Sequence, residues 1–281
     1  MALRREASHL HDLSLPVVCV VARTLPEGWE QAVVETWKRG VSVKTQYDAP
    51  GDPPSRDAIA VIAVADPMAE PRIHRAMPGG IRDLIVYTEE VVSGIHDHWI
   101  DPEHGKWQYT YHERLAAYTV PGLPDPVNQL DYMIDALAAC EHTRRAQAVT
   151  WKCWEDAGYE HPACLQRLWA RVVDGKLCMN AHMRSNDAFK AAFMNMYAFT
   201  ELQAFLAAQL SERLGRPVPV GQYTHIADSF HIYGSYFAEF EAFLESLRRR
   251  TFEERTFRTD QVADIISEAR EEVKKEVQER R

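Results

Sequence analysis

Short apolar runs along the first 64 residues alternate with amphipathic and polar segments. The runs 15–22 and 58–64 are rich in β-branched residues and bounded by proline or polar residues, which predicts two buried strands. Residues 27–39 carry apolar side chains at helical spacing and end at Gly40, which predicts a helix. The proline- and glycine-rich stretch 49–56 is expected to be a loop.

Two further segments have the helical pattern, and an aromatic segment separates them. Apolar positions recur at helical spacing in 83–94 and 127–140. Residues 95–126 are rich in His, Trp, Tyr and Pro and are expected to be irregular. Loops of this kind often line functional sites.

The centre of the chain predicts a strand followed by a β-hairpin. The run 148–151 has strand character, and the runs 168–173 and 176–183 flank Asp174-Gly175. An Asp-Gly pair provides the positive φ angles that a tight hairpin turn requires. The two flanking runs are therefore expected to be antiparallel neighbours.

The remaining sequence predicts a long central helix and a charged end. The apolar run that follows Asp187 and extends to about 214 is expected to be a buried helix, followed by a strand at 223–233 and a helix at 235–250. The end of the chain repeats apolar residues within charged sequence, which indicates a surface or partner-contacting helix or a solvated tail. We expect one α+β domain over 1–259 and a charged helical tail over 260–281.

Composition and charge exclude several classes of protein. The chain has 281 residues, of which 46% are hydrophobic and 26% charged, as in soluble globular proteins. No apolar run approaches the length of about 20 residues that spans a bilayer, and Met1–Arg5 is not followed by an apolar stretch typical of a leader. We therefore expect a cytoplasmic protein without a membrane partner. The net charge of −9 argues against a nucleic-acid partner.

The cysteines and histidines do not form a recognisable metal motif. No two of the five cysteines make a C-x-x-C pair, so neither a zinc site nor a disulfide framework is indicated. His96, His98, His104 and His112 could suggest a metal site, but they do not supply a convincing ligand set. We expect no metal.

Cys164 is the candidate nucleophile because of the arginines around it. Arg184 lies 20 residues after it, across the predicted hairpin, and Arg144-Arg145 lies 20 residues before it. Adjacent guanidinium groups favour an anion such as phosphate. A thiol near such charges is expected to have its thiolate favoured, as a nucleophilic cysteine requires.

The order of these motifs resembles the thymidylate synthase superfamily. The matching pieces are Arg144-Arg145 with Trp151, Pro162-Ala-Cys164, Asp174-Gly175-Lys176-Leu177, Arg184-Ser185-x-Asp187, Asn195 and His231-Ile232-Tyr233. The resemblance implies an α+β fold with a mixed β-sheet, flanking helices and a long buried central helix. It also implies that 1–259 is the catalytic domain and that two chains pack sheet to sheet as a homodimer with shared active sites.

The resemblance also implies the reaction and the groups that bind phosphate. Cys164 would add to carbon 6 of a pyrimidine nucleoside monophosphate, so that carbon 5 attacks the methylene of 5,10-methylenetetrahydrofolate. Arg184 and Ser185 would bind the 5′-phosphate in the same subunit. Arg144 and Arg145 would reach the phosphate in the neighbouring subunit.

Other site residues follow from the same resemblance. Asp187 resembles the folate-contacting carboxylate, Asn195 the base-reading amide, and His231 and Tyr233 the sugar-binding groups. Upstream, Glu90 resembles the glutamate that relays protons to the base, with Glu89 as an alternative, and Tyr111 resembles the tyrosine near the proton lost from carbon 5. Glu90 and Tyr111 could instead be a solvated acid and a packed loop residue. Lys44 occupies the place of a phosphate-binding arginine.

The chain departs from the family pattern at positions that bear on base and product. Leu165 replaces the histidine that usually follows the nucleophile in members that methylate dUMP. An Asn amide can read uracil in one orientation and cytosine in the other, and cytosine-specific relatives tend to use Asp here, so both bases stay open.

The C-terminal end and the folate-binding loop also depart from that pattern. The chain ends in a charged helix at Glu279–Arg281, and Trp99 and Trp107 do not match the family's folate-contacting Trp closely. A less sealed site favours water as the trap for the methylene intermediate. Hydroxymethylation is therefore the first expectation, methylation of dUMP to dTMP the second, and a nucleotide-binding regulator without turnover the third.

Overall fold

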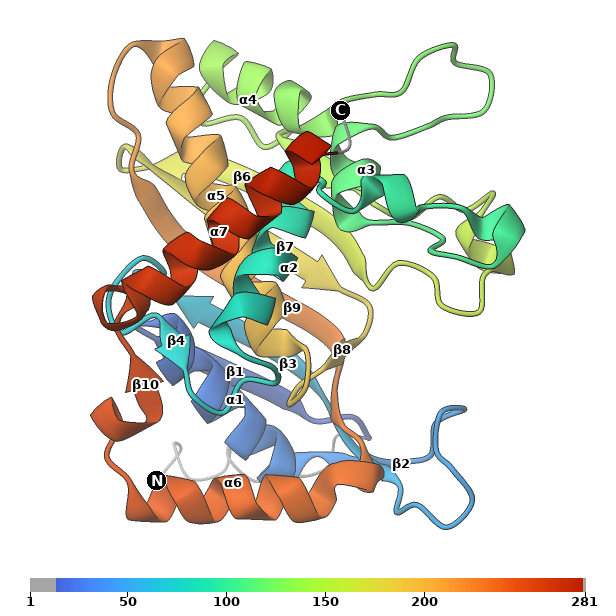
Figure 1. The fold of residues 1–281 in the computed structure, drawn as a ribbon, viewed down its shortest axis with the longest axis vertical. Helices are drawn as coiled ribbons and strands as arrows, with labels where there is room; N and C mark the ends of the chain where they lie inside the picture. Colours follow the sequence, from blue (N-terminus) through green and yellow to red (C-terminus); the bar gives the residue numbers. More distant parts are fainter. Residues whose placement is uncertain (1–13, 280–281) are drawn as a thin grey trace, which may run out of the picture.

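The computed structural model describes residues 14–279 and has one mixed β-sheet at its centre (Figure 1). The strand order is β1-β3-β9-β7-β6-β5, with β2 paired to β3 and β8 paired to β9. The pairs β1/β3 and β7/β9 are parallel, and β3/β9, β6/β7 and β5/β6 are antiparallel. The strands are Val17–Ala22 (β1), Val41–Val43 (β2), Ser55–Val64 (β3), Gln147–Val149 (β5), Leu165–Val173 (β6), Lys176–Met183 (β7), Asn186–Asp187 (β8) and Val220–Ile232 (β9), and the separate pair is Ile73–His74 (β4) with Thr256–Phe257 (β10).

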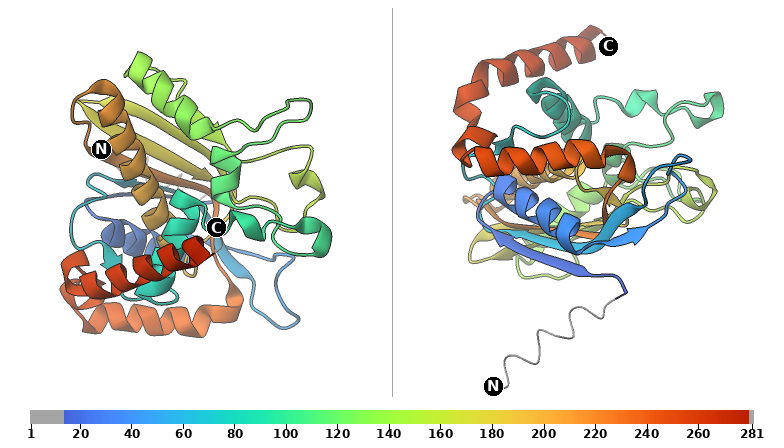
Figure 2. Two further views of the ribbon diagram at one scale, coloured as in Figure 1. Left: turned by 45° about the horizontal axis from the view of Figure 1, so that its top comes forward. Right: turned by 90° about the horizontal axis from the view of Figure 1, so that it is seen from below.

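The helices pack on one face of this sheet (Figure 2). They are Leu25–Arg39 (α1), Ile81–Ser93 (α2), Tyr111–Ala116 (α3), Gln129–Ala139 (α4), Ala192–Leu214 (α5), Phe237–Arg249 (α6) and Ala263–Glu279 (α7). Strand residues alternate between the two faces, and those on the helical side, such as Val18 and Ile62, are fully buried. On the other face Val21 is 80% exposed. One broad face of the sheet is therefore open in the single chain.

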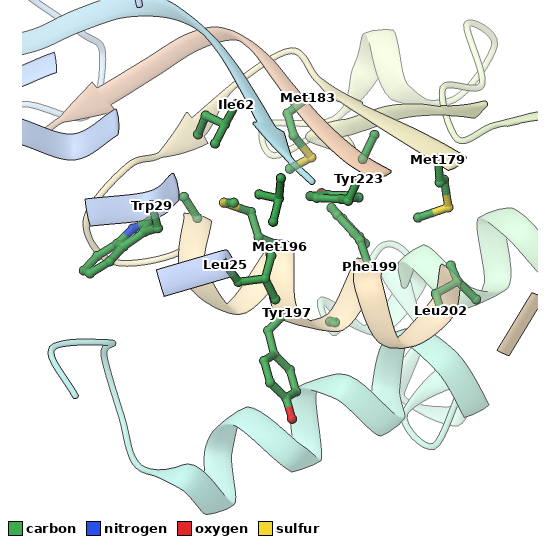
Figure 3. Close-up of a cluster of buried hydrophobic side chains, with 14 of the residues drawn as sticks. Leu25, Trp29, Ile62, Met179, Met183, Met196, Tyr197, Phe199, Leu202 and Tyr223 are labelled. Atoms are coloured by element: carbon green, nitrogen blue, oxygen red, sulfur yellow. The ribbon is translucent and has the colours of Figure 1, made fainter. Parts of the chain in front are cut away.

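The predicted long helix is α5, which forms the centre of the core. Met196, Phe199 and Leu202 are fully buried, and Figure 3 shows them beside the sheet residues Met183 and Tyr223. The α+β class, the mixed sheet and the buried central helix are therefore confirmed.

The predicted hairpin is also confirmed. Asp174 has a φ of 49° and Gly175 a φ of 74°, and the flanking strands β6 and β7 are antiparallel neighbours. The long helix was predicted after Asp187, and α5 begins a few residues further on, at Ala192. Asn186–Asp187 form β8, which pairs with β9.

The C-terminal helix α7 packs on α2 and lies across the surface of the molecule (Figure 1). Ala269 and Val273 are buried, while charged residues cover the remaining surface of the helix. The side chains of Arg270 and Glu89 also approach each other at 3.7 Å. Helix α2, which carries Glu90, is therefore supported by its packing against α7.

Parts of the two ends lie outside the described residues. The leader inference from Met1–Arg5 concerns such residues, as does the last part of Glu279–Arg281. Among residues 14–279, no helix is long and apolar enough to cross a membrane.

Candidate active site

Cys164 and Arg184 lie side by side at one end of the hairpin. Cys164 directly precedes β6 and Arg184 directly follows β7, and the Arg184 backbone N–H donates to the Cys164 carbonyl at 2.9 Å. The Arg184 Nη2 atom is 3.6 Å from the Cys164 Sγ atom. The sequence separation of 20 residues is therefore closed by the antiparallel pairing of the two strands.

The Cys164 thiol is more buried than the sequence suggested. Burial raises its pKa, and the positive charge of Arg184 opposes that rise without cancelling it. The expectation that the thiolate is favoured was therefore wrong for the chain without ligand, because removal of the sulfur from water outweighs one nearby guanidinium.

A pocket of about 470 Å³ opens over Cys164. Three predicted residues line it with the thiol, namely Arg184, Ser185 and Tyr233. The other lining residues are Tyr47, Tyr109, His161, Pro162, Ser235 and Tyr236. The pocket thus combines a thiol, a guanidinium, hydroxyl groups and aromatic rings, which suits a planar ring that carries an anionic group.

A second pocket of about 540 Å³ adjoins the first, since Tyr109 and His161 line both. The predicted acid Glu90 and the predicted tyrosine Tyr111 line this second pocket together with Tyr87 and Trp107. The structure therefore brings both upstream residues to the neighbourhood of Cys164.

Glu90 is held by a histidine from the aromatic segment. His96 Nδ1 lies 2.9 Å from Glu90 Oε2, and the His96 ring stacks on Trp99 with a centroid distance of 3.7 Å. Burial raises the pKa of Glu90, and the contact with His96 opposes that rise. A carboxyl group with a raised pKa is suited to proton transfer near neutral pH.

Tyr111 is fixed next to the nucleophile. The Leu165 backbone N–H donates to the Tyr111 hydroxyl oxygen at 3.3 Å. Burial raises the pKa of Tyr111 and also that of Tyr109, so both rings are neutral phenols at physiological pH. Both hydroxyl groups can therefore donate or accept a proton in hydrogen bonds close to Cys164.

Asn195 lies one layer deeper than the sequence predicted. It is 6% exposed and is not among the residues that line either pocket. Its Oδ1 atom accepts a hydrogen bond from the Tyr87 hydroxyl. Tyr87 therefore connects the predicted base-reading amide to the pocket.

Asp187 and His231 lie on the paired strands β8 and β9. Asp187 Oδ1 accepts from the backbone N–H groups of Phe189 and Lys190 at 3.1 and 2.8 Å, and its Oδ2 atom accepts from the Tyr236 hydroxyl. His231 Nδ1 lies 3.0 Å from the Ser229 hydroxyl, and burial lowers the pKa of His231. Asp187 is thus anchored behind Tyr236, a residue that lines the Cys164 pocket.

Three predicted phosphate-binding residues lie outside the Cys164 pocket of the same chain. Lys44 is exposed and is not among the pocket residues. Arg144 and Arg145 are also exposed, and they precede β5, whose residue Gln147 pairs with Trp169 of β6. The chain does not bring these two arginines to its own thiol.

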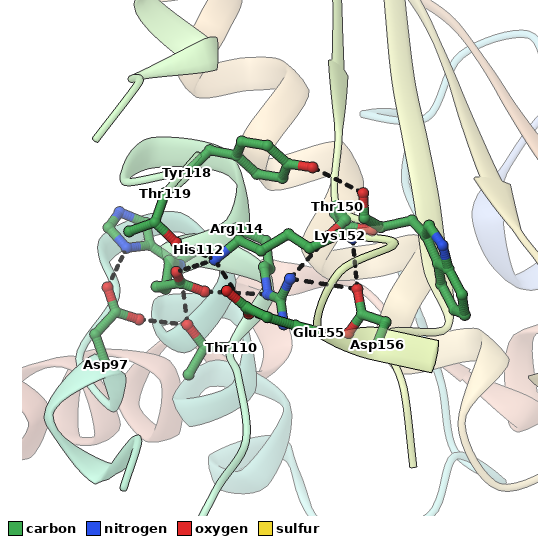
Figure 4. Close-up of polar contacts among 12 residues, drawn as sticks. Asp97, Thr110, His112, Arg114, Tyr118, Thr119, Thr150, Lys152, Glu155 and Asp156 are labelled. Carbon is green, nitrogen blue, oxygen red and sulfur yellow. Dashed lines mark hydrogen bonds and ion pairs between the residues drawn. The ribbon is translucent and has the colours of Figure 1, made fainter. Parts of the chain in front are cut away.

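The four histidines of the aromatic segment serve separate contacts. His104 Nδ1 lies 2.7 Å from Asp101, and His112 Nδ1 lies 2.6 Å from Asp97 (Figure 4). Beside them, the buried Arg114 pairs with Asp156 (Figure 4). Within residues 14–279 no group of three potential ligands is placed to hold a metal ion.

Sequence reasoning missed several pocket residues. Tyr109 and Tyr87 had a detectable signal, because Tyr109 is two residues before Tyr111 and Tyr87 is one helical turn before Glu90. Tyr47, His161 and Tyr236 each lie three residues from a predicted site residue, but they come from loops or a short turn whose conformation a single sequence does not predict.

Comparison with known proteins agrees with this arrangement. The family model described as thymidylate synthase matches residues 83–277. A putative thymidylate synthase of Methanocaldococcus jannaschii is 26% identical over 222 residues, which cover 77% of this chain and 91% of that protein. One from Methanopyrus kandleri is 31% identical over 216 residues, which cover 76% of this chain and 92% of that protein.

A solved structure has the same fold. Thermostable thymidylate synthase A from Bacillus subtilis superposes with a TM-score of 0.59 at 19% sequence identity, covering 79% of this chain and 84% of that structure. At that identity the likeness concerns the fold. Together with the family match over most of the chain, it shows that this chain belongs to the thymidylate synthase family, whose members are one-carbon transferases.

Proposed function

We propose that the protein transfers a one-carbon unit from 5,10-methylenetetrahydrofolate to carbon 5 of a pyrimidine nucleoside 5′-monophosphate, with a hydroxymethyl product. The observation that carries this proposal is the Cys164 thiol, 3.6 Å from the Arg184 guanidinium, in a pocket that also contains Ser185 and Tyr233. A nucleophile beside an anion-binding group matches a substrate with an electrophilic ring and a phosphate.

Arg184 is prepared to bind phosphate. Its Nε atom donates to the Ala163 carbonyl at 3.0 Å and its Nη2 atom to the Pro162 carbonyl at 2.6 Å, which fixes the plane of the guanidinium. A guanidinium has five N–H donors, so some remain for a ligand. With the adjacent hydroxyl of Ser185, Arg184 can hold the 5′-phosphate and so place the pyrimidine over the thiol.

In the proposed reaction Cys164 forms a covalent bond to the pyrimidine at the first step and is released at the last. Its sulfur adds to carbon 6, the electron pair moves through carbon 5 toward the substituent on carbon 4, and carbon 5 becomes nucleophilic. Glu90 delivers a proton toward the carbon 4 side, and Tyr111 lies where the proton on carbon 5 leaves. The overall balance is nucleotide plus methylenetetrahydrofolate plus water, which gives hydroxymethyl nucleotide plus tetrahydrofolate.

The second pocket fits the folate, which supplies the methylene carbon. On the side of this pocket away from Tyr87 and Tyr111, which face the base, Trp107 is 40% exposed, as a platform for a planar ring requires. Asp187 Oδ2 can accept a second hydrogen bond beside that from Tyr236. Asp187 and Trp107 are therefore the residues we assign to folate binding.

Access of water favours hydroxymethylation. Among the described residues, no side chain of α7 lines the Cys164 pocket or the Glu90 pocket, because α7 packs on the far side of α2. A site that is open to solvent lets water reach the exocyclic methylene before hydride transfer. Methylation of dUMP is the alternative, in line with the name putative thymidylate synthase that the archaeal relatives carry.

We also propose a homodimer that shares its active sites. The face of the sheet opposite the helices is uncovered in the single chain and includes the exposed Val21. Arg144 and Arg145 are exposed and lie near the end of β6 away from Cys164. In a sheet-to-sheet dimer these arginines would meet the phosphate in the other subunit.

The test uses CMP, dCMP, UMP and dUMP with tritium on carbon 5, together with methylenetetrahydrofolate. Tritium release from one nucleotide, without dihydrofolate, is expected for hydroxymethylation. Strong dihydrofolate formation from dUMP would establish the alternative. In the Cys164→Ala variant we expect nucleotide binding without release. No release by the unchanged protein from any nucleotide would contradict the enzyme proposal and favour a regulator.

A further inference from the structure

One contact joins two helices at the boundary between the pocket and the core. Tyr87 on α2 and Asn195 on α5 are 108 residues apart in sequence, and the Tyr87 hydroxyl donates to Asn195 Oδ1. Among the described residues, the Asn195 side chain makes this one hydrogen bond. Leu165, whose side chain is apolar and fully buried, cannot hold the amide. The orientation of the Asn195 amide therefore depends on Tyr87.

The direction of this hydrogen bond fixes what the pocket offers a ligand. A carbonyl oxygen can only accept, so the Tyr87 proton is committed to Asn195. Burial raises the pKa of Tyr87, so the ring stays a neutral phenol and the bond persists at physiological pH. The Tyr87 oxygen then has only lone pairs for a ligand.

The order of groups around the pocket places the carbon 4 side of the ring near Tyr87. Carbon 6 lies at Cys164, and carbon 5 lies beside Tyr111, whose hydroxyl is tied to the residue after Cys164. Carbon 4 follows carbon 5 in the ring. The groups beyond Tyr111 in the second pocket are Tyr87 and Glu90. The substituent on carbon 4 therefore meets the Tyr87 oxygen, whose own proton is donated to Asn195, beside the acid Glu90.

We propose that Tyr87 is a specificity-determining residue that makes the site select a 4-amino pyrimidine, cytosine, over a 4-oxo pyrimidine, uracil. An exocyclic amine can donate to the Tyr87 oxygen, which lines the pocket, whereas the carbon 4 oxygen of uracil would face the lone pairs of that oxygen. This inference rests on the proposed function, because it uses the same pocket and the same attack by Cys164.

The experiment compares the unchanged protein with Tyr87→Phe. Tritium release gives kcat/KM for cytosine and uracil nucleotides, and calorimetry without folate gives their Kd values. We expect the unchanged protein to favour the cytosine nucleotide by at least about tenfold, since an unmatched polar group in a buried site is poorly tolerated. Tyr87→Phe should reduce that ratio by about tenfold, because it releases the amide and removes one acceptor.

Tyr197→Phe is the matched control. Tyr197 is on the same helix as Asn195, two residues away, and also loses only a hydroxyl group, but its ring packs against Arg72 and does not line either site pocket. The base ratio should not change in this variant. Circular dichroism confirms that each variant is folded, and the ratio for the unchanged protein tests the proposal even where Tyr87→Phe is unstable.

Each outcome has a distinct meaning. An equal or uracil-favouring ratio in the unchanged protein overturns the proposal, as does an unchanged ratio in Tyr87→Phe. Absence of tritium release from every nucleotide contradicts the proposed function instead, and the Kd ratio then still decides whether the pocket selects cytosine.

Discussion

The buried ion pair between Arg114 and Asp156 gives a prediction about stability that can be worked out from the contacts. Arg114 is fully buried and Asp156 is 1% exposed. The two guanidinium nitrogens donate to the two carboxylate oxygens at 3.3 and 3.1 Å, and the Lys152 backbone N–H donates to Asp156 at 2.6 Å (Figure 4). One carboxylate therefore accepts three hydrogen bonds in a site closed to water.

We predict that Asp156→Asn strongly destabilises the fold. Removal of one partner of a buried pair costs about 3–5 kcal/mol, because the other charge is left uncompensated. Glu113 and Glu155 lie 3.3 Å from Arg114 and keep part of that compensation, so a loss near the lower limit, about 3 kcal/mol, is expected. For a chain of this size that corresponds to a Tm lower by about 6–12 °C.

The assay is urea denaturation followed by circular dichroism at one fixed protein concentration. Asp260→Asn is the matched control, since Asp260 pairs with Arg258 on the surface, where the two side chains are 68% and 53% exposed. Its expected cost is below about 1 kcal/mol. If Asp156→Asn were no more destabilising than Asp260→Asn, the account of this buried pair would be wrong.

Three further predictions concern the site and its support. Because burial raises the pKa of Cys164, the rate of its alkylation by iodoacetamide should increase as the pH rises through and above the ordinary thiol range. Arg184→Gln should slow alkylation at pH 8, and Cys164→Ala gives the background rate. A rate that is already maximal at pH 7 would contradict this prediction. Val273→Asp should lower the free energy of unfolding by about 1–3 kcal/mol and should speed amide hydrogen exchange in α2 as well as in α7. Unchanged exchange in α2 would show that α7 does not support α2. Lys44→Ala should change the KM for the nucleotide by less than about threefold, because an exposed charge contributes little binding energy. Arg184→Gln should raise this KM by more than about tenfold. Equal effects of the two variants in steady-state kinetics would contradict the placement of Lys44 outside the pocket.

The sequence predicted the parts of the site that local chemistry determines. Asp174-Gly175 has few alternatives to a tight turn, and that turn makes Cys164 and Arg184 neighbours across two strands. The length and apolar character of α5 likewise leave it no place except the core. These predictions depend on short-range preferences and on burial, which a single sequence records.

Other features depend on contacts between distant segments and could not be predicted. The hydrogen bond from Tyr87 to Asn195 joins residues 108 positions apart. The pairing of β8 with β9 likewise joins residues that are 44 positions apart, such as Asn186 and Phe230. The pKa of Cys164 depends on how deeply the fold buries the sulfur, so nearby charge alone predicted the wrong direction.

The bond between Cys164 and carbon 6 of the pyrimidine is the central claim, and intact-protein mass spectrometry tests it most directly. A 5-fluoro pyrimidine nucleotide cannot lose the group on carbon 5 as a proton, so the covalent adduct should accumulate when methylenetetrahydrofolate is present. The account predicts a mass increase of the protein equal to nucleotide plus folate, which proteolytic peptide mapping locates on the peptide that contains Cys164, and no increase in Cys164→Ala. An unmodified Cys164, or an adduct on any of the four other cysteines in its place, would contradict it.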